Sequence, residues 1–194
     1  MLKQRNRDFP LDLSKKLNIA HINLCTEVEG PYKRMAIWFQ GCNILCKGCC
    51  NPELQEIKVS HLMTVQDVVD IAVKSKAENG IEGVTFLGGE PTLQEGLPCL
   101  AKALAQVDLG TILFTGIEYD SLSDDIKANI DLIVDGRYEA TLFDDERNLV
   151  GSKNQQIIYL SDRYITCLNW FMKNREKKVE INVGSMLFVN GDVI

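Results

Sequence analysis

Short apolar runs alternate with longer segments whose apolar residues recur at helical spacing. Residues 19–25 (IAHINLC) and 34–39 (RMAIWF) are short runs that predict strands, and the second is rich in aromatic and branched side chains. Thr64, with Asp67 three residues later, predicts a capping box at the start of a helix that stops at Asn79-Gly80. The apolar face of this helix comprises Val65, Val68, Val69, Ala72 and Val73.

The same alternation continues to residue 134. A short run, Val84 to Leu87, precedes a second predicted helix, whose apolar face comprises Leu97, Leu100, Ala101, Leu104 and Ala105. Thr111–Thr115 and Leu132–Val134 are further strand candidates on either side of a weaker helix around Leu122, Ile126 and Ile130. Strands that alternate with helices imply right-handed βαβ crossovers and a mainly parallel sheet, so we expect an α/β fold.

The last 30 residues show a different pattern. Val179, Ile181 and Val183 alternate with polar residues, Gly184-Ser185 is a turn signal, and 186–189 are again apolar, which predicts a C-terminal β-hairpin. A length of 194 residues favours a single domain.

Composition narrows the range of partners. The chain is 45% hydrophobic and 25% charged, with a net charge of -6 and a pI near 5.0. A nucleic-acid partner is not expected, because such binders carry clustered Lys and Arg. The basic N-terminus lacks the apolar core of a signal peptide, and no stretch reaches the ~18 apolar residues of a membrane span. We therefore expect a cytoplasmic protein without a membrane partner.

Four of the seven cysteines lie in one short stretch, GCNILCKGCC at 41–50. An odd number of cysteines, crowded in this way in a reducing compartment, indicates metal or redox chemistry rather than disulfides. The remaining three, Cys25, Cys99 and Cys167, lie in apolar stretches and are expected to be small buried hydrophobic residues.

The spacing of Cys42, Cys46 and Cys49 restricts the kind of metal site. A structural zinc site needs four ligands, commonly two separated pairs, and no second pair exists here. Ferredoxin-type carriers hold each cluster with four thiolates. Three local thiolates leave one iron of a cubane open, and an open iron can bind and activate a ligand.

Several polar loops follow the strand candidates. They contain Cys42–Cys49, Gly88–Pro91, Gly116 and Asp135-Gly136. In parallel sheets ligands bind at the carboxyl ends of the strands, so these loops are expected to share one rim.

The spacing CxxxCxxC, within QGCNILCKGCCNPE, resembles the radical S-adenosylmethionine (radical SAM) enzymes, and in particular the activating enzymes of anaerobic ribonucleotide reductases. Further similar segments cover roughly residues 18–160: EGPYKR (29–34), FLGGEPTLQ (86–94), FTGIEYDSL (114–122), LIVDGRYE (132–139) and GSKNQQII (151–158). The resemblance implies an incomplete (β/α) barrel with a radical SAM core at 18–160. Residues 1–17 would be an N-terminal extension, and 161–194 a helix and hairpin extension of the same domain.

The resemblance also assigns roles to residues. Cys42, Cys46 and Cys49 would hold a [4Fe-4S] cluster whose fourth iron is chelated by S-adenosylmethionine. Gly88, Gly89 and Glu90 would bind the methionyl amino group, and Gly48, Cys49 and Cys50 would lie along the adenosyl part. Cys50 stands where this branch has an aromatic residue, which leaves ligation by Cys50 as an alternative to Cys49.

The implied reaction is reductive cleavage of S-adenosylmethionine to methionine and a 5′-deoxyadenosyl radical, which would install a glycyl radical on a partner reductase. The partner would be the anaerobic ribonucleotide reductase or another glycyl-radical enzyme, with a low-potential electron donor such as flavodoxin or ferredoxin. Two alternatives stay open: a radical SAM enzyme for another peptide or small molecule, similar to the carboxydeazaguanine synthases, and a non-catalytic iron-sulfur or zinc module.

Other conspicuous residues have simpler interpretations. Glu27, Glu29 and the run Asp144 to Glu146 are expected to be solvated carboxylates. Trp38 and Phe39 are expected to pack in the core beneath the cysteine loop.

Overall fold

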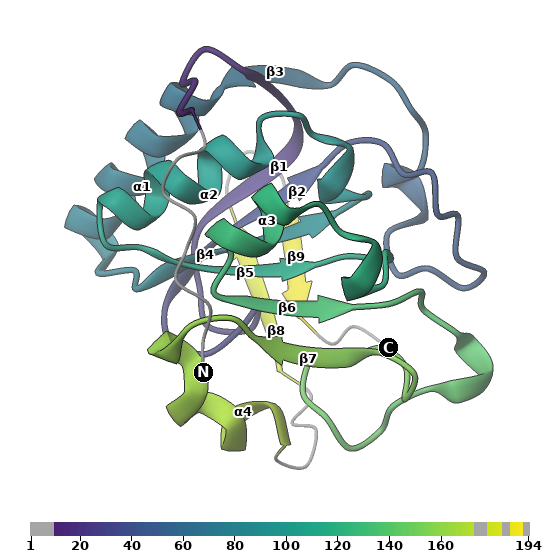
Figure 1. The fold of residues 1–194 in the computed structure, drawn as a ribbon. Coiled ribbons are helices and arrows are strands. Elements are labelled where there is room, and N and C mark those ends of the chain that lie inside the picture. The colour runs from purple at the N-terminus through teal and green to yellow at the C-terminus, as the bar shows by residue number, and fades with distance from the viewer. Residues whose placement is uncertain (1–9, 173–177, 184–186, 192–194) are drawn as a thin grey trace.

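A seven-stranded sheet forms the centre of the molecule (Figure 1). The computed structural model describes residues 10–172, 178–183 and 187–191. The strand order is β3-β1-β2-β4-β5-β6-β7. The strands are β1 (Lys16–Thr26), β2 (Arg34–Phe39), β3 (His61–Thr64), β4 (Gly83–Gly88), β5 (Gly110–Phe114), β6 (Leu132–Asp135) and β7 (Gln156–Tyr159).

The four central strands, β2, β4, β5 and β6, are parallel, whereas β1, β3 and β7 run antiparallel to their neighbours. The expectation of a mainly parallel α/β sheet is therefore confirmed. Among the described residues the sheet stays open, with β3 and β7 as its edges, and it does not close into a barrel.

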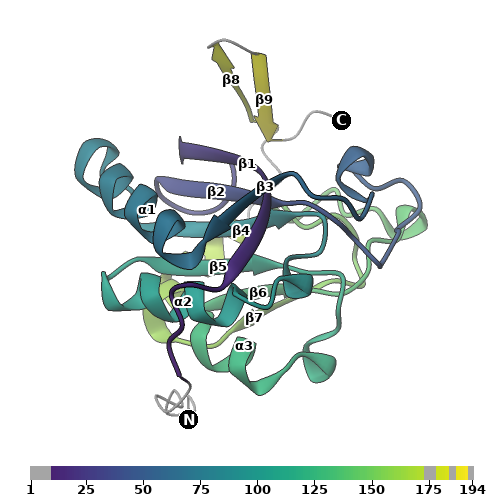
Figure 2. The ribbon, with the colours of Figure 1, turned by 90° about the horizontal axis from the view of Figure 1, so that it is seen from above.

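Three helices cover one face of the sheet: α1 (Val65–Asn79), α2 (Leu97–Gln106) and α3 (Asp124–Asn129) (Figure 2). The helix α1 begins with the predicted capping box between Thr64 and Asp67 and ends at Gly80, which adopts the left-handed conformation with φ 69°. In α2, Ala103 is buried in place of the predicted Ala105, which is exposed.

Five short 3-10 helices occupy connections among the described residues: η1 (Pro52–Leu54), η2 (Pro91–Leu93), η3 (Tyr119–Ser121), η4 (Ala140–Leu142) and η5 (Asp162–Cys167). The last of them leads into α4 (Leu168–Met172), a helix on the other face of the sheet.

The pleat of the sheet divides the core into two layers. Leu113 and Ile133 point into the larger layer, under α1 to α3. Their neighbours Ile112 and Leu132 point to the opposite face and pack with Tyr164 and other residues of η5 and α4. Because successive strand residues face opposite sides, continuous apolar runs serve both layers.

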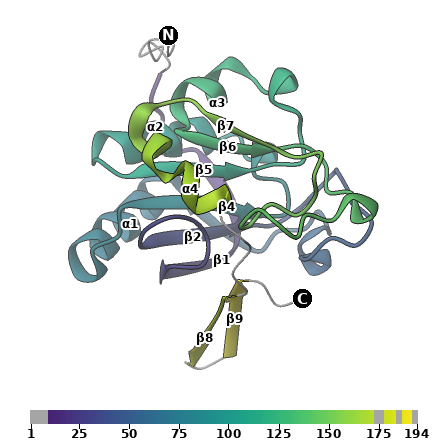
Figure 3. The ribbon, with the colours of Figure 1, turned by 90° about the horizontal axis from the view of Figure 1, so that it is seen from below.

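The predicted hairpin forms as β8 (Val179–Val183) and β9 (Leu187–Gly191), on the opposite side of the sheet from α2 and α3 (Figure 3). Its turn, Gly184-Ser185, lies outside the described residues. The backbone N–H of Glu27 donates to Glu180 (2.8 Å), and that of Gly191 donates to Glu29 (3.2 Å). The expectation that Glu29 is solvated is wrong, because Glu29 is buried and accepts this hydrogen bond from the hairpin.

Asp144 is also buried rather than solvated. Its carboxylate accepts hydrogen bonds from the backbone N–H groups of Glu146 and Arg147, both at 2.9 Å, and pairs with the Arg147 guanidinium.

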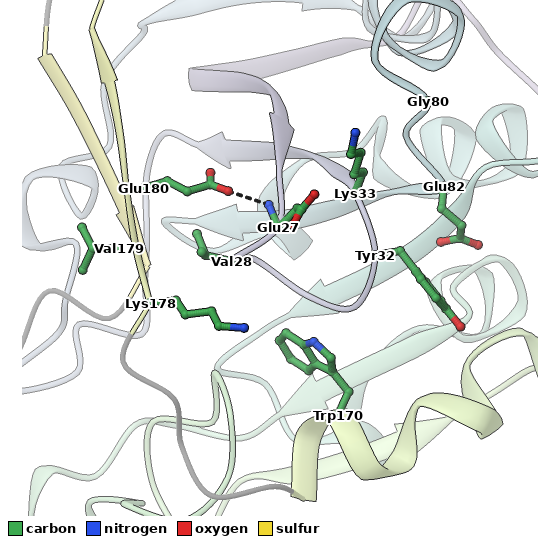
Figure 4. A pocket seen from close by; sticks show the side chains of 10 residues that line it. All are labelled: Glu27, Val28, Tyr32, Lys33, Gly80, Glu82, Trp170, Lys178, Val179 and Glu180. Atoms are coloured by element: carbon green, nitrogen blue, oxygen red, sulfur yellow. Dashed lines mark hydrogen bonds between the residues drawn. The ribbon is translucent and has the colours of Figure 1, made fainter.

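The amino edge of the parallel strands carries a buried network around Arg34. This guanidinium is 0% exposed and donates to Thr85 Oγ1 (2.7 Å), Tyr164 Oη (2.9 Å) and Glu82 Oε2 (3.2 Å). A cavity of about 940 Å³ opens at the same edge, with Trp170 of α4 on one side and residues of the hairpin on the other (Figure 4).

Candidate iron-sulfur site at the carboxyl edge of the sheet

The carboxyl ends of the four parallel strands lie side by side. Phe39, the last residue of β2, pairs with Gly88, the last residue of β4, while Phe86 pairs with Leu113, and Phe114 with Val134. The loops that follow these strands therefore share one rim, as expected from the sequence. This rim lies at the opposite edge from the Arg34 network.

The cysteine loop and the GGEP turn are joined through their backbones. Gly89 N–H donates to the Phe39 carbonyl and Glu90 N–H donates to the Gly41 carbonyl, both at 2.8 Å. A Cβ on Gly89 would lie 2.1 Å from the Gly41 oxygen, and Gly88 has φ +99°. These two glycines are thus required for the close approach of the two motifs.

A short segment, 54–56, supports the start of the cysteine loop. Gly41 N–H donates to the Leu54 carbonyl (2.9 Å) and Cys42 N–H to the Gln55 carbonyl (3.1 Å). The side chain of Gln40 donates to the carbonyl of Glu56 (2.7 Å). The first cysteine is therefore held on a backbone that is hydrogen-bonded on both sides.

The four thiols of the loop differ in exposure. Cys42 is buried, Cys46 and Cys49 are half-buried, and Cys50 is exposed. A hydrogen bond from the Cys50 thiol, aided by the Asn51 N–H, lowers the pKa of Cys49 to about 6, so its thiolate forms readily.

Within the described part of the chain, no three His, Cys, Asp or Glu side chains are grouped so that they could hold a metal ion. The three thiols share one loop without converging, and their assignment as ligands stays a prediction.

Glu90 is buried at this rim with 1% of its surface exposed. Its Oε1 accepts from Thr92 N–H (3.0 Å), Thr92 Oγ1 (2.7 Å) and Thr115 Oγ1 (2.7 Å), and its Oε2 accepts from Gly116 N–H (2.9 Å). All four donors are uncharged. Among the described residues, no cationic side chain forms an ion pair with this carboxylate.

Two further loops touch the cysteine loop. Ile44 packs against Gly116 of the loop after β5, where an added Cβ would lie 3.0 Å from the Ile44 side chain. After β6, the Arg137 guanidinium donates to the Ile44 carbonyl, and Gly48 faces Tyr138. No site role was predicted from the sequence for Thr115 or Arg137, although they lie within the segments FTGIEYDSL and LIVDGRYE, respectively.

The other cysteines lie on different elements. Cys99 of α2 and Cys167 of η5 are buried as expected, whereas Cys25 of β1 is half-buried. The ring of His21 lies against that of Trp38 in a tilted arrangement, with centroids 5.5 Å apart, and both Trp38 and Phe39 are buried. In the described ranges, no helix has the length and apolar character required to cross a membrane.

An open, mainly parallel sheet with a loop of four cysteines at its carboxyl edge is the arrangement expected of an iron-sulfur protein. Residues 28–158 match the family model described as "4Fe-4S single cluster domain", and the chain belongs to this family.

Two of the proteins that the chain matches are activating enzymes. Over 147 residues the chain is 26% identical to the anaerobic ribonucleoside-triphosphate reductase-activating protein of enterobacteria phage T4. This match covers 73% of this chain and 93% of the phage protein. It is 42% identical over 71 residues to the pyruvate formate-lyase-activating enzyme of Listeria monocytogenes, but this match covers only 34% of this chain and 28% of that enzyme.

Among solved structures, QueE from Escherichia coli has a TM-score of 0.41, 17% identity and 52% coverage of both chains. The resemblance to radical SAM activating enzymes is confirmed by the family model and the activating-enzyme relatives, and with it the class of enzyme and its cofactors, a [4Fe-4S] cluster and S-adenosylmethionine.

The residues of the rim fit these two cofactors. Thiolates are the usual protein ligands of iron-sulfur clusters, and one loop carries them here. A buried carboxylate with only neutral donors lacks a counter-charge, and the ammonium group of S-adenosylmethionine would supply one.

Proposed function

We propose that this protein installs a glycyl radical on a partner anaerobic reductase. The observation that carries the proposal is the match to the phage activating protein over 93% of the length of that protein. When bound, the reduced cluster supplies the electron that cleaves S-adenosylmethionine to methionine and a 5′-deoxyadenosyl radical.

Each part of the rim has a role in this proposal. Cys42, Cys46 and Cys49 hold the cluster, and the lowered pKa of Cys49 favours the thiolate that iron requires. Gly88 and Gly89 bring the turn after β4 against the cysteine loop.

Glu90 would contact the methionyl amino group through Oε2. This oxygen accepts a single hydrogen bond, from Gly116, and therefore keeps a lone pair for an ammonium N–H. The segment Gly48 to Cys50 would lie along the adenosyl part.

The loops that surround the rim would orient the reactants and exclude other hydrogen donors. A primary carbon radical abstracts hydrogen from many C–H bonds, so the enzyme directs the reaction by positioning. A glycine Cα of the partner suits this step, because the flanking amides delocalise the product radical.

The partner would be an anaerobic ribonucleotide reductase or another glycyl-radical enzyme. A low-potential flavodoxin or ferredoxin would deliver the electron. The proposal places the reaction in the cytoplasm, where reducing conditions keep the thiols free. It also keeps 18–160 as the catalytic core, with 1–17 and 161–194 as extensions.

The test starts with anaerobic reconstitution, which should give about four irons per chain. With dithionite and S-adenosylmethionine the protein should release 5′-deoxyadenosine, and with a candidate reductase it should produce the doublet of a glycyl radical in electron paramagnetic resonance (EPR). Release of 5′-deoxyadenosine without a glycyl radical on any candidate reductase would instead support a small-molecule substrate. A bound but unreactive cluster would contradict radical chemistry.

A further inference from the structure

The tip of the cysteine loop, residues 43–48, has few bonds to the rest of the protein. Within the part of the chain that the structure describes, one backbone hydrogen bond joins this tip to the rest of the cysteine loop, from Cys49 N–H to the Cys46 carbonyl (3.3 Å). Among the described residues, the only hydrogen bond that reaches 43–48 from another loop comes from the Arg137 guanidinium, which donates to the Ile44 carbonyl. Ile44 lies midway between two of the predicted ligands, Cys42 and Cys46.

Arg137 itself is anchored at its backbone. Its carbonyl accepts from Asn154 Nδ2 (2.7 Å), and the preceding carbonyl, of Gly136, accepts from Gln155 Nε2 (2.8 Å). The side chain of Gln155 also accepts from Gly151 N–H (3.0 Å). The GSKNQ segment therefore holds the backbone from which the guanidinium extends.

Packing supports the same contact between loops. Gly48 faces Tyr138 and Ala140, each 3.6 Å from where a Cβ on Gly48 would lie. The Tyr138 ring in turn lies against Gly151, 2.9 Å from the corresponding position. A side chain on Gly151 would push the ring towards the cysteine loop.

We infer that Arg137 is a positioning residue for the iron-sulfur cluster: it fixes the loop between the first two thiolates, and the GSKNQ segment fixes Arg137. This inference rests on the cluster of the proposed function. It goes beyond that function because it assigns a positioning role to residues of the LIVDGRYE and GSKNQQII segments. With a cluster bound, the guanidinium would add a positive charge near the cysteine loop, which would favour the reduced state of the cluster and raise its reduction potential.

Four single variants of the full chain separate these effects. Arg137→Ala removes both the bond and the charge, whereas Arg137→Lys keeps the charge and loses the planar donor. Asn154→Ala keeps the guanidinium and removes the hydrogen bond to the Arg137 carbonyl, one of the two anchors of this backbone. Lys153→Ala is the matched control, because Lys153 is adjacent in sequence but pairs with Asp145 on the surface (3.4 Å).

The first measurement needs no cluster. Hydrogen exchange of the iron-free protein should be faster at amides 43–48 in Arg137→Ala and Asn154→Ala, and unchanged in Lys153→Ala. Circular dichroism confirms that each variant is folded.

The second measurement uses the reconstituted protein. Iron release to a ferrous chelator should be about tenfold faster in Arg137→Ala, since a hydrogen bond from a charged donor is lost. The midpoint potential from an EPR-monitored redox titration should fall in Arg137→Ala and stay near the wild-type value in Arg137→Lys.

Equal exchange and equal iron release in Arg137→Ala and Lys153→Ala would overturn the inference. A changed potential with unchanged exchange would also overturn it, because Arg137 would then act through charge alone. A wild-type protein that holds its cluster but releases no 5′-deoxyadenosine would contradict the proposed function and leave this comparison valid.

Discussion

Both edges of the parallel strands bury a charged side chain, but only one of these side chains has a partner of opposite charge within the described chain. At the amino edge, Arg34 has a carboxylate partner, Glu82, and further acceptors in Thr85 and Tyr164. At the carboxyl edge, Glu90 is equally buried, yet its four donors are uncharged.

The difference separates a structural network from a binding site. A buried guanidinium whose donors are satisfied within the chain holds the fold together, because its loss would leave buried acceptors unpaired. A buried carboxylate without a cation becomes favourable when a ligand brings the opposite charge. The amino edge is therefore expected to control stability and the carboxyl edge to control cofactor binding.

The largest effect is expected at the cysteines of the carboxyl edge. Replacement of Cys42, Cys46 or Cys49 by Ala should remove the cluster and abolish the release of 5′-deoxyadenosine, because in the proposed function each thiolate would hold one iron. Iron analysis after reconstitution measures this directly.

Cys50→Ala is the matched control and should retain about four irons per chain. If Cys50→Ala lost the cluster while Cys49→Ala kept it, the ligands would instead be spaced as CxxxCxxxC.

The next largest effect is expected on stability at the amino edge. Arg34→Met should lower the free energy of unfolding by about 3 kcal/mol, since it leaves the buried Val84 carbonyl without its donor and removes one of the two arginines that pair with Glu82. Urea denaturation of the iron-free protein measures the loss. Lys74→Met breaks an exposed i,i+4 pair with Glu78 and should change stability by less than about 0.5 kcal/mol. Equal losses in the two variants would contradict the structural role of the network.

A smaller effect is expected on cofactor affinity at the carboxyl edge. Glu90→Gln keeps the size of the side chain but removes its charge, and it should weaken binding of S-adenosylmethionine about tenfold. Equilibrium binding to the reconstituted protein measures the affinity. Glu95→Gln, at a neighbouring exposed position, serves as the control. Unchanged affinity in Glu90→Gln would mean that the carboxylate does not meet the ammonium group.

The smallest effect is expected at Tyr164. Tyr164→Phe removes the hydroxyl that bonds Arg34 and Glu82 and should cost about 1 kcal/mol near neutral pH. Burial raises the pKa of this phenol above its usual value. The folded state therefore keeps the proton when the unfolded chain loses it, and the wild type loses stability as pH rises above about 10. The difference in the free energy of unfolding between wild type and Tyr164→Phe should therefore become smaller from pH 8 to pH 11. A difference that stays constant over this range would contradict the raised pKa.

Local signals in the sequence predicted much of the fold and the rim. Thr64 and Asp67 mark the start of α1 because a capping box involves neighbouring residues only. The rim followed from topology, since the loops after parallel strands must meet at one edge.

Local sequence patterns did not predict the contacts between distant segments. Arg34 bonds Tyr164, 130 residues away, and Glu29 accepts a hydrogen bond from Gly191, 162 residues away. The bond from Arg137 to Ile44 spans 93 residues and depends on the bend of two loops. Hydrophobic periodicity carries no information about such pairs.

The central claim is that three thiolates of one loop hold a cluster with an iron open to S-adenosylmethionine. EPR spectra of the reduced, reconstituted protein, recorded before and after addition of S-adenosylmethionine, test it most directly. The account predicts that the cofactor changes the spectrum of the wild type, and that Glu90→Gln needs about ten times more cofactor for the same change. A spectrum that saturating S-adenosylmethionine leaves unchanged would contradict the claim.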